Sequence, residues 1–90
     1  MKFVWDARKA RANLRKHKVS FDEAVTVFAD WLSVTIPDPE HSQTEERFLI
    51  LGSSNRGRIL VVAHTFRFDA VRIISARRAN RDERHEYEET

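Results

Sequence analysis

Apolar residues recur at helical spacing in the first third of the chain and at strand spacing in most of the remainder. Lys2–Trp5 alternates weakly and predicts a short strand. Residues 7–17 contain no glycine or proline and follow Asp6, a favourable N-cap, so a helix is predicted there. Ser20 and Glu23 stand three residues apart, as in a capping box, and predict the start of a second helix.

The spacing also predicts which side of each helix is buried. In the first helix the apolar stripe is Ala7, Ala10 and Leu14, and His17 lies on the same side at the end of the helix. In the second helix the stripe is Phe21, Ala24, Val25 and Phe28. Lys18 falls in the tight corner between the helices, where a residue with positive φ, normally glycine, is expected.

The pattern in the rest of the chain predicts strands separated by turn residues. Pro37 and Pro39 open a polar loop, and the segment from Gly52 to Gly57 has turn chemistry. Asn80 can cap a final helix that is polar on nearly all sides. The predicted strands and the final helix are Trp31–Ile36, Arg47–Leu51, Arg58–Phe66, Val71–Arg77 and Arg81–Glu88.

The last two strands form a predicted hairpin whose register follows from its loop. A loop centred on Phe68 and Asp69 places Phe66 opposite Val71. One face of the hairpin would then carry Leu60, Val62, His64, Phe66, Val71, Ile73, Ser75 and Arg77, and the other Thr65, Arg67, Arg72, Ile74 and Arg78. Because both faces hold apolar residues, the hairpin is expected in the middle of the sheet.

The element order β-α-α-β-β-β-α predicts an α+β fold with a mostly antiparallel sheet and helices on one side. Ninety residues are enough for one domain over 1–90. The absence of cysteine excludes disulfides and cysteine nucleophiles, and it fits a reducing cytoplasm. The first residues are too few and too charged for a signal peptide, and no apolar run approaches a membrane span. A cytoplasmic protein without membrane contact is therefore expected.

The net charge is only +2, but the charges are segregated along the chain. Residues 1–20 hold seven bases and one acid, and residues 21–46 hold seven acids and no base. Residues 47–78 hold seven arginines and one acid, and residues 79–90 hold two arginines and five acids. Each single charge is ordinarily a solvated surface group. The segregation nevertheless predicts a basic face and an acidic face on one small body.

Four strings, in this order, make the chain resemble the BrnT toxin family of bacterial type II toxin–antitoxin systems. They are FVWDARKARANLRKHKVSFDEAVTVFAD, EERFLILG, HTFR and RIISARRANRDERHEYE, and together they cover nearly the whole chain. The resemblance implies one BrnT-like domain with a RelE-like fold, and a ribonuclease toxin that blocks translation. It also implies a cognate ribbon-helix-helix antitoxin that neutralises the toxin. Operator DNA would be contacted only through this antitoxin.

Two turn positions depart from the pattern of that family, which usually has glycine after the Lys-His pair and commonly after the arginine of the hairpin loop. This chain has Lys18 and Phe68 at those positions. Because both are turn positions, the departures bear on local geometry more than on the fold.

Metal-free RNA cleavage requires a base for the 2′-hydroxyl, cations for the charge that grows on the phosphate, and an acid for the leaving oxygen. Arg67, Arg72 and Arg77 are the candidate cations, because the guanidinium fork matches a phosphate. The alternative is that these arginines pair with Glu45, Glu46 or the acidic last helix, as semi-buried arginines commonly do. The residues alone support both interpretations.

His64 is the best-placed histidine for acid–base work, although its apolar neighbours favour a hydrogen-bonded core histidine. Glu46 is a second acid–base candidate, or a partner that holds an arginine. The candidate RNA contacts are Lys16, Phe68 and Arg78, the ring of Phe68 by stacking on a base. His41 lies in polar surroundings and is assigned no role.

Other classes of site lack support in the sequence. The histidines and acids do not have the spacing of a metal site, and neither a phosphate-binding glycine loop nor a serine nucleophile elbow is present, so no metal or cofactor is expected. One alternative function is a non-catalytic module whose arginine-rich sheet face binds protein or nucleic acid. A DNA-binding protein in its own right is disfavoured, because the first two helices lack a helix-turn-helix pattern with an exposed basic recognition face.

Overall fold

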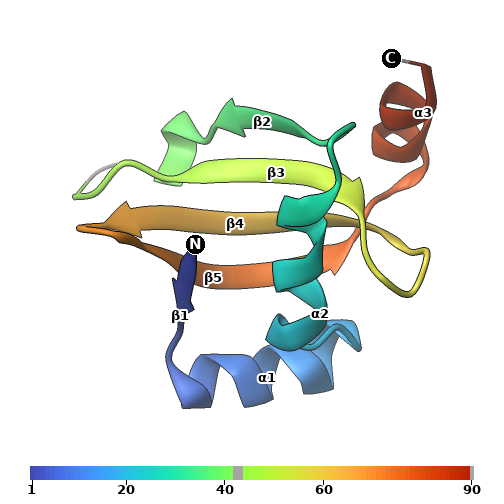
Figure 1. The fold of residues 1–90 in the computed structure, drawn as a ribbon. Coiled ribbons are helices and arrows are strands. Elements are labelled where there is room, and N and C mark those ends of the chain that lie inside the picture. Colours follow the sequence, from blue (N-terminus) through green and yellow to red (C-terminus); the bar gives the residue numbers. More distant parts are fainter. Residues whose placement is uncertain (42–43, 90) are drawn as a thin grey trace.

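Five strands form one mixed sheet in the order β1-β5-β4-β3-β2 (Figure 1). The computed structural model describes residues 1–41 and 44–89. The strands are β1 (Lys2–Val4), β2 (Val34–Pro37), β3 (Phe48–Ser53), β4 (Ile59–Arg67) and β5 (Ala70–Arg78). β1 is parallel to β5, and the other neighbouring pairs are antiparallel. The predicted α+β fold with a mostly antiparallel sheet is confirmed, and so is the central place of the hairpin β4–β5.

The helices lie on both faces of this sheet. Two helices, α1 (Ala7–His17) and α2 (Phe21–Thr26), cover what we call the inner face together with the 3-10 turn η1 (Val27–Ala29). The last helix, α3 (Arg81–Glu89), lies at the other end of the molecule from α1 (Figure 1). The side chains that face α3 belong to the opposite, outer face of the sheet: Leu49, Leu51 and Val61. The prediction that all helices lie on one side was therefore wrong.

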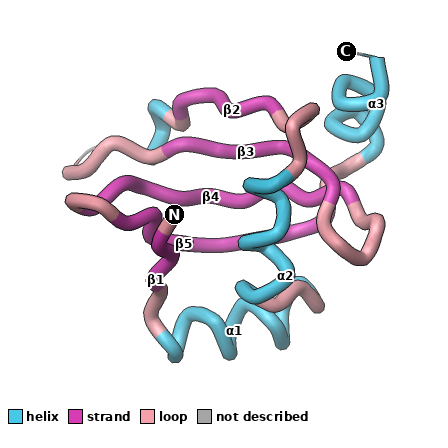
Figure 2. Tube along the Cα trace, in the orientation of Figure 1, coloured by secondary structure: helices cyan, strands magenta, loops and turns pink. Residues whose placement is uncertain are grey.

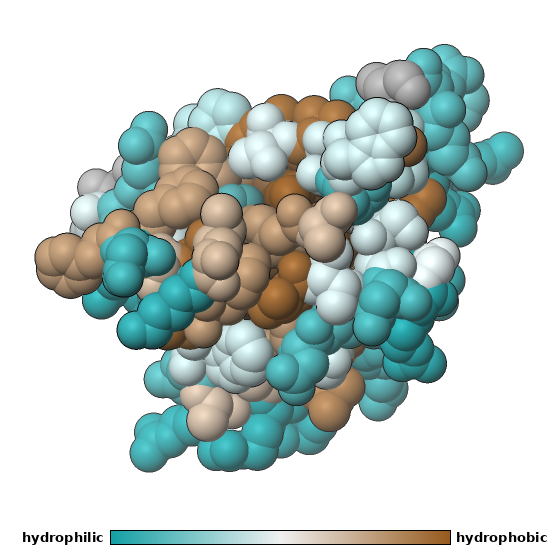
Figure 3. Space-filling view, viewed as in Figure 1, coloured by the Kyte–Doolittle hydropathy of each residue, from teal (hydrophilic) through white to brown (hydrophobic). Residues whose placement is uncertain are grey.

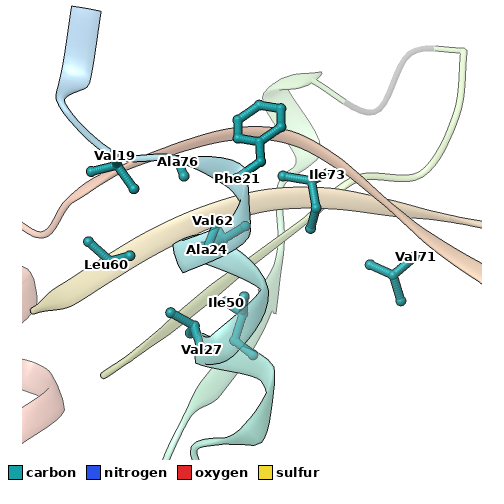
Figure 4. Packing of buried hydrophobic residues seen from close by; sticks show 10 residues of the cluster. All are labelled: Val19, Phe21, Ala24, Val27, Ile50, Leu60, Val62, Val71, Ile73 and Ala76. Carbon is teal, nitrogen blue, oxygen red and sulfur yellow. The ribbon is translucent and has the colours of Figure 1, made fainter. Parts of the chain in front are cut away.

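The hydrophobic core fills the space between the inner face and the first two helices (Figure 4). The helical layer contributes Val19, Phe21, Ala24 and Val27, and the sheet contributes Ile50, Leu60, Val62, Val71, Ile73 and Ala76. Each of these side chains is at most 4% exposed, and burial of such apolar surface is the main force that holds the layers together. No helix in the described part of the chain is long and apolar enough to cross a membrane.

The ends of the first two helices follow the predicted capping chemistry. Asp6 Oδ1 accepts hydrogen bonds from the backbone N–H groups of Arg8 and Lys9, at 2.8 and 3.1 Å. Lys18 has φ 59°, so the corner between α1 and α2 does contain the expected positive φ. The capping box is only half formed: Ser20 Oγ accepts from the N–H of Glu23, but the Glu23 carboxylate turns away to Arg58.

The buried side of α1 differs from the prediction. Leu14 is 50% exposed, whereas Asn13 is buried. Asn13 Nδ2 donates to the carbonyls of Val19 and Ala76 at 2.9 and 2.8 Å, and its Oδ1 accepts from the N–H of Ala76. Because β1 pairs with β5 only over residues 70–72, Asn13 replaces a neighbouring strand at Ala76. Apolar spacing cannot reveal such a contact with a distant backbone segment.

The strand predicted from Trp31 begins three residues later. Asp30 Oδ1 accepts from the N–H of Leu32, and the Asp30 carbonyl accepts from the N–H of Ser33, so residues 30–33 form a turn. β2 starts only at Val34 and includes Pro37, the residue predicted to stop it. A proline is tolerated there because β2 is an edge strand.

The hairpin register is correct at the loop and wrong beyond it. Phe66 lies opposite Val71 as predicted, but a β-bulge follows, because His64 faces Ile73 while Ala63 faces Ser75. Ile74 is the extra residue of β5, so every later β5 side chain changes face. Arg77 consequently joins the outer face, opposite Val61, and Arg78 moves to the inner face. Sequence alternation contains no signal for this extra residue.

Candidate anion-binding face

The outer face of the sheet carries a group of arginines that we call the arginine face: Arg47, Arg67, Arg72 and Arg77. On β4 and β5, the register places Arg72 opposite Thr65 and Arg77 opposite Val61, so both share a face with Arg67. The bulge is the cause of this arrangement, because a regular hairpin would put Arg77 on the inner face. Arg67, Arg72 and Arg77 thus share a face, which the predicted register did not allow.

One carboxylate lies among three of these guanidinium groups. Glu45 is 3.9 Å from Arg47, 3.6 Å from Arg67 and 3.8 Å from Arg72, and its side chain is 27% exposed. The loop that carries Glu45 and the tip of the β4–β5 hairpin lie at the same end of the sheet (Figure 2). The contacts of Arg67 and Arg72 with this carboxylate are longer than hydrogen bonds, so an anion can compete for both guanidinium groups.

Arg77 is held differently from the other three arginines. Its two terminal nitrogens donate to the two carboxylate oxygens of Glu83 in α3, at 2.8 and 2.9 Å. This bidentate hydrogen bonding raises the pKa of Arg77 and lowers that of Glu83. Glu83 also forms a reciprocal capping box with Asn80, which fixes the start of α3. The fork of Arg77 therefore already has a carboxylate partner.

A shallow depression of about 430 Å³ separates Arg77 from Arg47 on the outer face. Its lining is Asp38, Glu40, His41, Arg47, Leu49, Ala63, Ile74, Ser75 and Arg77. His41 Nδ1 lies 3.0 Å from Asp38 Oδ2, a distance at which the ring N–H donates to the carboxylate. The second ring nitrogen, Nε2, takes no part in this contact. The depression therefore combines cationic groups with an oriented imidazole.

His41 is the functional candidate that sequence reasoning missed. The 3-10 turn η2 (Pro39–His41) brings His41 back to Asp38, because residues three apart meet in such a turn. The signal available in the sequence was a histidine three residues after an aspartate in a proline-rich loop. The sequence alone does not show that this turn lies on the outer face, so it does not identify His41 as a candidate.

His64, the acid–base candidate from the sequence, lies in the core of the inner face. It is 1% exposed, its Nδ1 donates to the carbonyl of Val62 at 3.1 Å, and burial lowers its pKa, so it is held neutral. Three rings surround the imidazole, with centroids 4.9 to 6.0 Å away: Phe28, Phe48 and Phe66. The arrangement supports the core interpretation of His64 and gives it no path to a substrate.

The hairpin end presents aromatic rings to solvent. Phe66 is 57% exposed and Phe68 is fully exposed, and Figure 3 shows apolar surface extending to this end of the molecule. Phe68 has φ 53°, a backbone conformation that is unfavourable for a residue with a side chain. A fully exposed ring on a strained backbone has no role in packing, and it directly follows Arg67 of the arginine face.

The remaining candidates are dispersed. Lys16 is exposed on α1, in the helical layer that covers the inner face, and Arg78 is exposed on the inner side of β5. Glu46 is exposed beside Glu45, but it is Glu45 that contacts the arginines. The structure therefore brings together Arg67 and Arg72 with Phe68 nearby and places Arg77 at the edge of the same face. Glu46 lies beside this face, because its carbonyl accepts from the Thr65 hydroxyl, whereas Lys16, His64 and Arg78 lie on the inner side of the sheet.

A protein-family model and a solved structure both match this chain. Residues 5–83 match the family model described as the ribonuclease toxin, BrnT, of type II toxin–antitoxin systems. The fold is similar to the 1.1 Å crystal structure of the Brucella abortus ribonuclease toxin, BrnT, with a TM-score of 0.72. The two sequences are 26% identical over 90% of this chain and 99% of that chain. None of the curated proteins matches the chain.

Proposed function

Because this chain belongs to the BrnT family of type II toxin ribonucleases, we propose that it cleaves mRNA without a metal ion and thereby blocks translation. The toxin acts in the cytoplasm, and a cognate ribbon-helix-helix antitoxin holds it inactive and alone contacts operator DNA. The observation that carries the proposal is the arginine face, where three guanidinium groups share one carboxylate beside a depression that contains an oriented histidine.

The arginine face suits the charge that develops during RNA cleavage. Attack of the 2′-hydroxyl on the neighbouring phosphate adds negative charge to the phosphate oxygens. Arg67 and Arg72 come from adjacent strands of one rigid hairpin, so their forks are positioned before the substrate binds. A phosphate that binds there competes with Glu45, whose contacts of 3.6 and 3.8 Å to these two arginines are longer than hydrogen bonds. Preorganised cations of this kind replace the metal ion that other nucleases use.

The acid–base group that fits this face is His41. Its exposed ring lies on the same depression as Arg47 and Arg77, and Asp38 orients it through Nδ1. The other ring nitrogen, Nε2, can take the proton of the 2′-hydroxyl or protonate the leaving 5′-oxygen. Glu46 remains a proposed second acid–base group because it is exposed one residue from Glu45.

Replacing His41 with alanine is expected to slow RNA cleavage about 100-fold, the lower range of what one positioned acid–base group contributes. The matched control is His85→Ala, because His85 also pairs with a carboxylate, Glu89, at 3.1 Å but lies on α3 outside the depression. Single-turnover rates on one RNA measure both variants. Equal rates for the two variants would remove His41 from the mechanism.

Replacing Phe68 with glycine is expected to raise stability while weakening RNA binding. Glycine relieves the positive φ of 53°, a gain of about 1 kcal/mol in the free energy of unfolding, while loss of a stacking ring reduces affinity roughly tenfold. Phe68→Ala is the control, since alanine removes the ring and keeps the backbone strain. Denaturant titrations and binding curves separate the two effects. If Phe68→Ala binds RNA like the original chain, the ring has no stacking role.

The proposed function is tested by incubating the purified chain with mRNA in excess EDTA and mapping the RNA ends. We expect cleavage to persist and to leave a 2′,3′-cyclic phosphate, and we expect induced expression in a host to arrest growth unless the neighbouring antitoxin gene is coexpressed. Cleavage that requires Mg²⁺ would contradict the metal-free chemistry. Binding of RNA without any cleavage would instead favour the non-catalytic module.

A further inference from the structure

A second concave site lies next to the arginine face, between α3 and the outer face of β2, β3 and β4. This groove has a volume of about 160 Å³ and is lined by Val34, Ile36, Leu49, Leu51, Val61, Glu83, Glu86 and Tyr87. Val34 and Ile36 are 39% and 52% exposed, although they belong to the floor of the groove. Two branched apolar side chains are thus only partly covered by the protein itself.

The walls of the groove are fixed in position. The Tyr87 hydroxyl of α3 donates to Asp30 Oδ2 at 2.5 Å, and the same oxygen accepts from the N–H of Ser53 at 2.8 Å. The hydrogen bond to Asp30 raises the pKa of Tyr87 to about 12, so the hydroxyl keeps its proton. Gly52 permits this close packing, because a Cβ there would come within 2.9 Å of the Ser33 Cβ. The site is a built feature of the fold, with rigid walls.

Two further exposed apolar residues come shortly before β2 in the chain. Trp31 and Leu32, in the turn that leads directly into β2, are 89% and 53% exposed. Exposed large apolar side chains next to a groove are typical of protein–protein interfaces, and tryptophan is prominent among the residues that dominate binding energy.

The charge around the groove determines what class of molecule can occupy it. Glu83 and Glu86 form its polar rim, and α3 carries three more acids, Asp82, Glu88 and Glu89, against two arginines. This surface repels the phosphates of RNA and attracts lysine and arginine side chains. The fitting occupant is a protein segment with apolar and basic residues.

The edge of β2 indicates the shape of that segment. The N–H of Asp38 donates to the carbonyl of Arg47, the residue before β3, so in β2 the backbone N–H and C=O groups of Val34 and Ile36 point toward β3. The backbone groups of Thr35 and Pro37 point away from the sheet. Pro37 has no N–H to offer, which disfavours pairing with an added strand. The apolar side chains that remain available, Val34 and Ile36, face into the groove. An amphipathic helix lying beside α3 meets these conditions.

We propose that this groove is the docking site of the cognate antitoxin, occupied by an amphipathic helix whose apolar side contacts Val34 and Ile36 and whose basic residues pair with Glu86. The identity of the partner rests on the proposed function. Leu49 lines both the groove and the depression that holds His41 and Arg47, so a helix in the groove extends over the catalytic depression. Neutralisation then follows from steric exclusion of RNA, with no change in the fold of the toxin.

The test measures the affinity of the purified full chain for the purified antitoxin encoded by the neighbouring gene, by calorimetry. Ile36→Glu and Glu86→Lys are expected to weaken binding about tenfold or more, because each alters a central contact of the groove. Glu88→Lys is the matched control: it makes the same charge change on the same helix at a residue outside the groove, and unchanged affinity is expected. In a host, the first two variants should still arrest growth but escape rescue by the antitoxin.

Equal affinities for Glu86→Lys and Glu88→Lys would overturn the proposal. So would a concentration-dependent dimer of the chain alone that Ile36→Glu abolishes, because the groove would then bind a second copy. Weaker RNA binding by Ile36→Glu, in the absence of antitoxin, would assign the groove to the substrate instead. The binding measurement does not depend on catalysis. A chain that fails to cleave RNA would contradict the proposed function, but the affinities of the variants for the antitoxin could still be compared.

Discussion

The Arg72→Ala variant is expected to cleave RNA about 100-fold more slowly than the original chain while remaining folded. Arg72 lies in β5 with its guanidinium 3.8 Å from Glu45 and its side chain 25% exposed, and it directs a two-pronged donor at the position proposed for the phosphate. Loss of one preorganised cation removes stabilisation that grows as charge develops on the phosphate. Single-turnover cleavage rates measure the effect, and circular dichroism confirms the fold.

Two further variants show whether the cleavage rate depends on the charge of Arg72, on its planar guanidinium group, or on its position on the outer face. Arg72→Lys keeps a positive charge but loses the planar fork, so its rate should fall between those of the original chain and Arg72→Ala. Arg78→Ala removes an arginine from the same strand, but on the inner face, and should leave the rate unchanged. If Arg72→Ala cleaved RNA as fast as Arg78→Ala, the phosphate would not bind on the outer face.

The Glu23→Gln variant is expected to lose about 3 kcal/mol of unfolding free energy, which for a chain of this size lowers the melting temperature by roughly 15 °C. Glu23 is 5% exposed and is paired with Arg58, whose Nε donates to Glu23 Oε2 at 2.9 Å while a terminal nitrogen donates to the other oxygen. Ser54 Oγ donates to the same carboxylate at 2.7 Å. This network joins α2 to the β3–β4 turn, and Arg58 also donates to the Lys18 carbonyl in the α1–α2 corner.

The pH dependence of stability isolates this carboxylate. The hydrogen bonds from Arg58 hold the pKa of Glu23 below its ordinary value of 4.5 in the folded chain. Its contribution is therefore complete above pH 4.5 and is lost as the pH falls from there through the folded pKa. The difference in unfolding free energy between the original chain and Glu23→Gln should be constant near neutral pH and shrink in acid. Asp22→Asn, at an exposed neighbour, is the control, and a difference that did not shrink would exclude Glu23 as the group responsible.

Local sequence signals predicted the elements that depend on local chemistry. Asp6 and Lys18 mark the ends of α1 because capping and positive φ are set by neighbouring residues, and the Phe66–Val71 pairing follows from the hairpin loop. The bulge at Ile74 and the burial of Asn13 depend on contacts between distant segments, so spacing could not predict them. The same bulge decides which face Arg77 and Arg78 occupy.

The sequence predicted the candidate site only in part, because some of its residues are positioned by contacts between distant segments. Arg67 and Arg72 are close to the hairpin loop, where the predicted register is correct, and they do lie on one face. His64 falls in the segment whose apolar neighbours already indicated a core residue, and the structure places it among three phenylalanine rings. His41 was missed because its role depends on how the loop after β2 folds over the sheet.

The charge blocks of the sequence are only partly separated in the fold, because Glu23, Glu45 and Glu83 pair with arginines of residues 47–78. The acidic α3 and the edge strand β2 lie together at one end of the molecule, and the basic α1 lies at the other (Figure 1). Lys16 belongs to this basic helix, where it remains a proposed contact for the RNA backbone. Pairing with internal carboxylates does not hold Arg67 and Arg72 tightly, because their contacts with Glu45 are 3.6 and 3.8 Å, longer than hydrogen bonds, whereas Glu83 holds Arg77 at 2.8 and 2.9 Å.

The central claim is that an RNA phosphate binds on the outer face between Arg67 and Arg72. The most direct measurement is a titration of the chain with a short RNA in which 2′-methoxy groups prevent cleavage, followed by NMR of the arginine side-chain Nε–H signals. The largest shifts are predicted for Arg67 and Arg72, with Arg78 as the unshifted internal reference. Shifts confined to Arg78 and the arginines of α1, with Arg67 and Arg72 unmoved, would contradict the account.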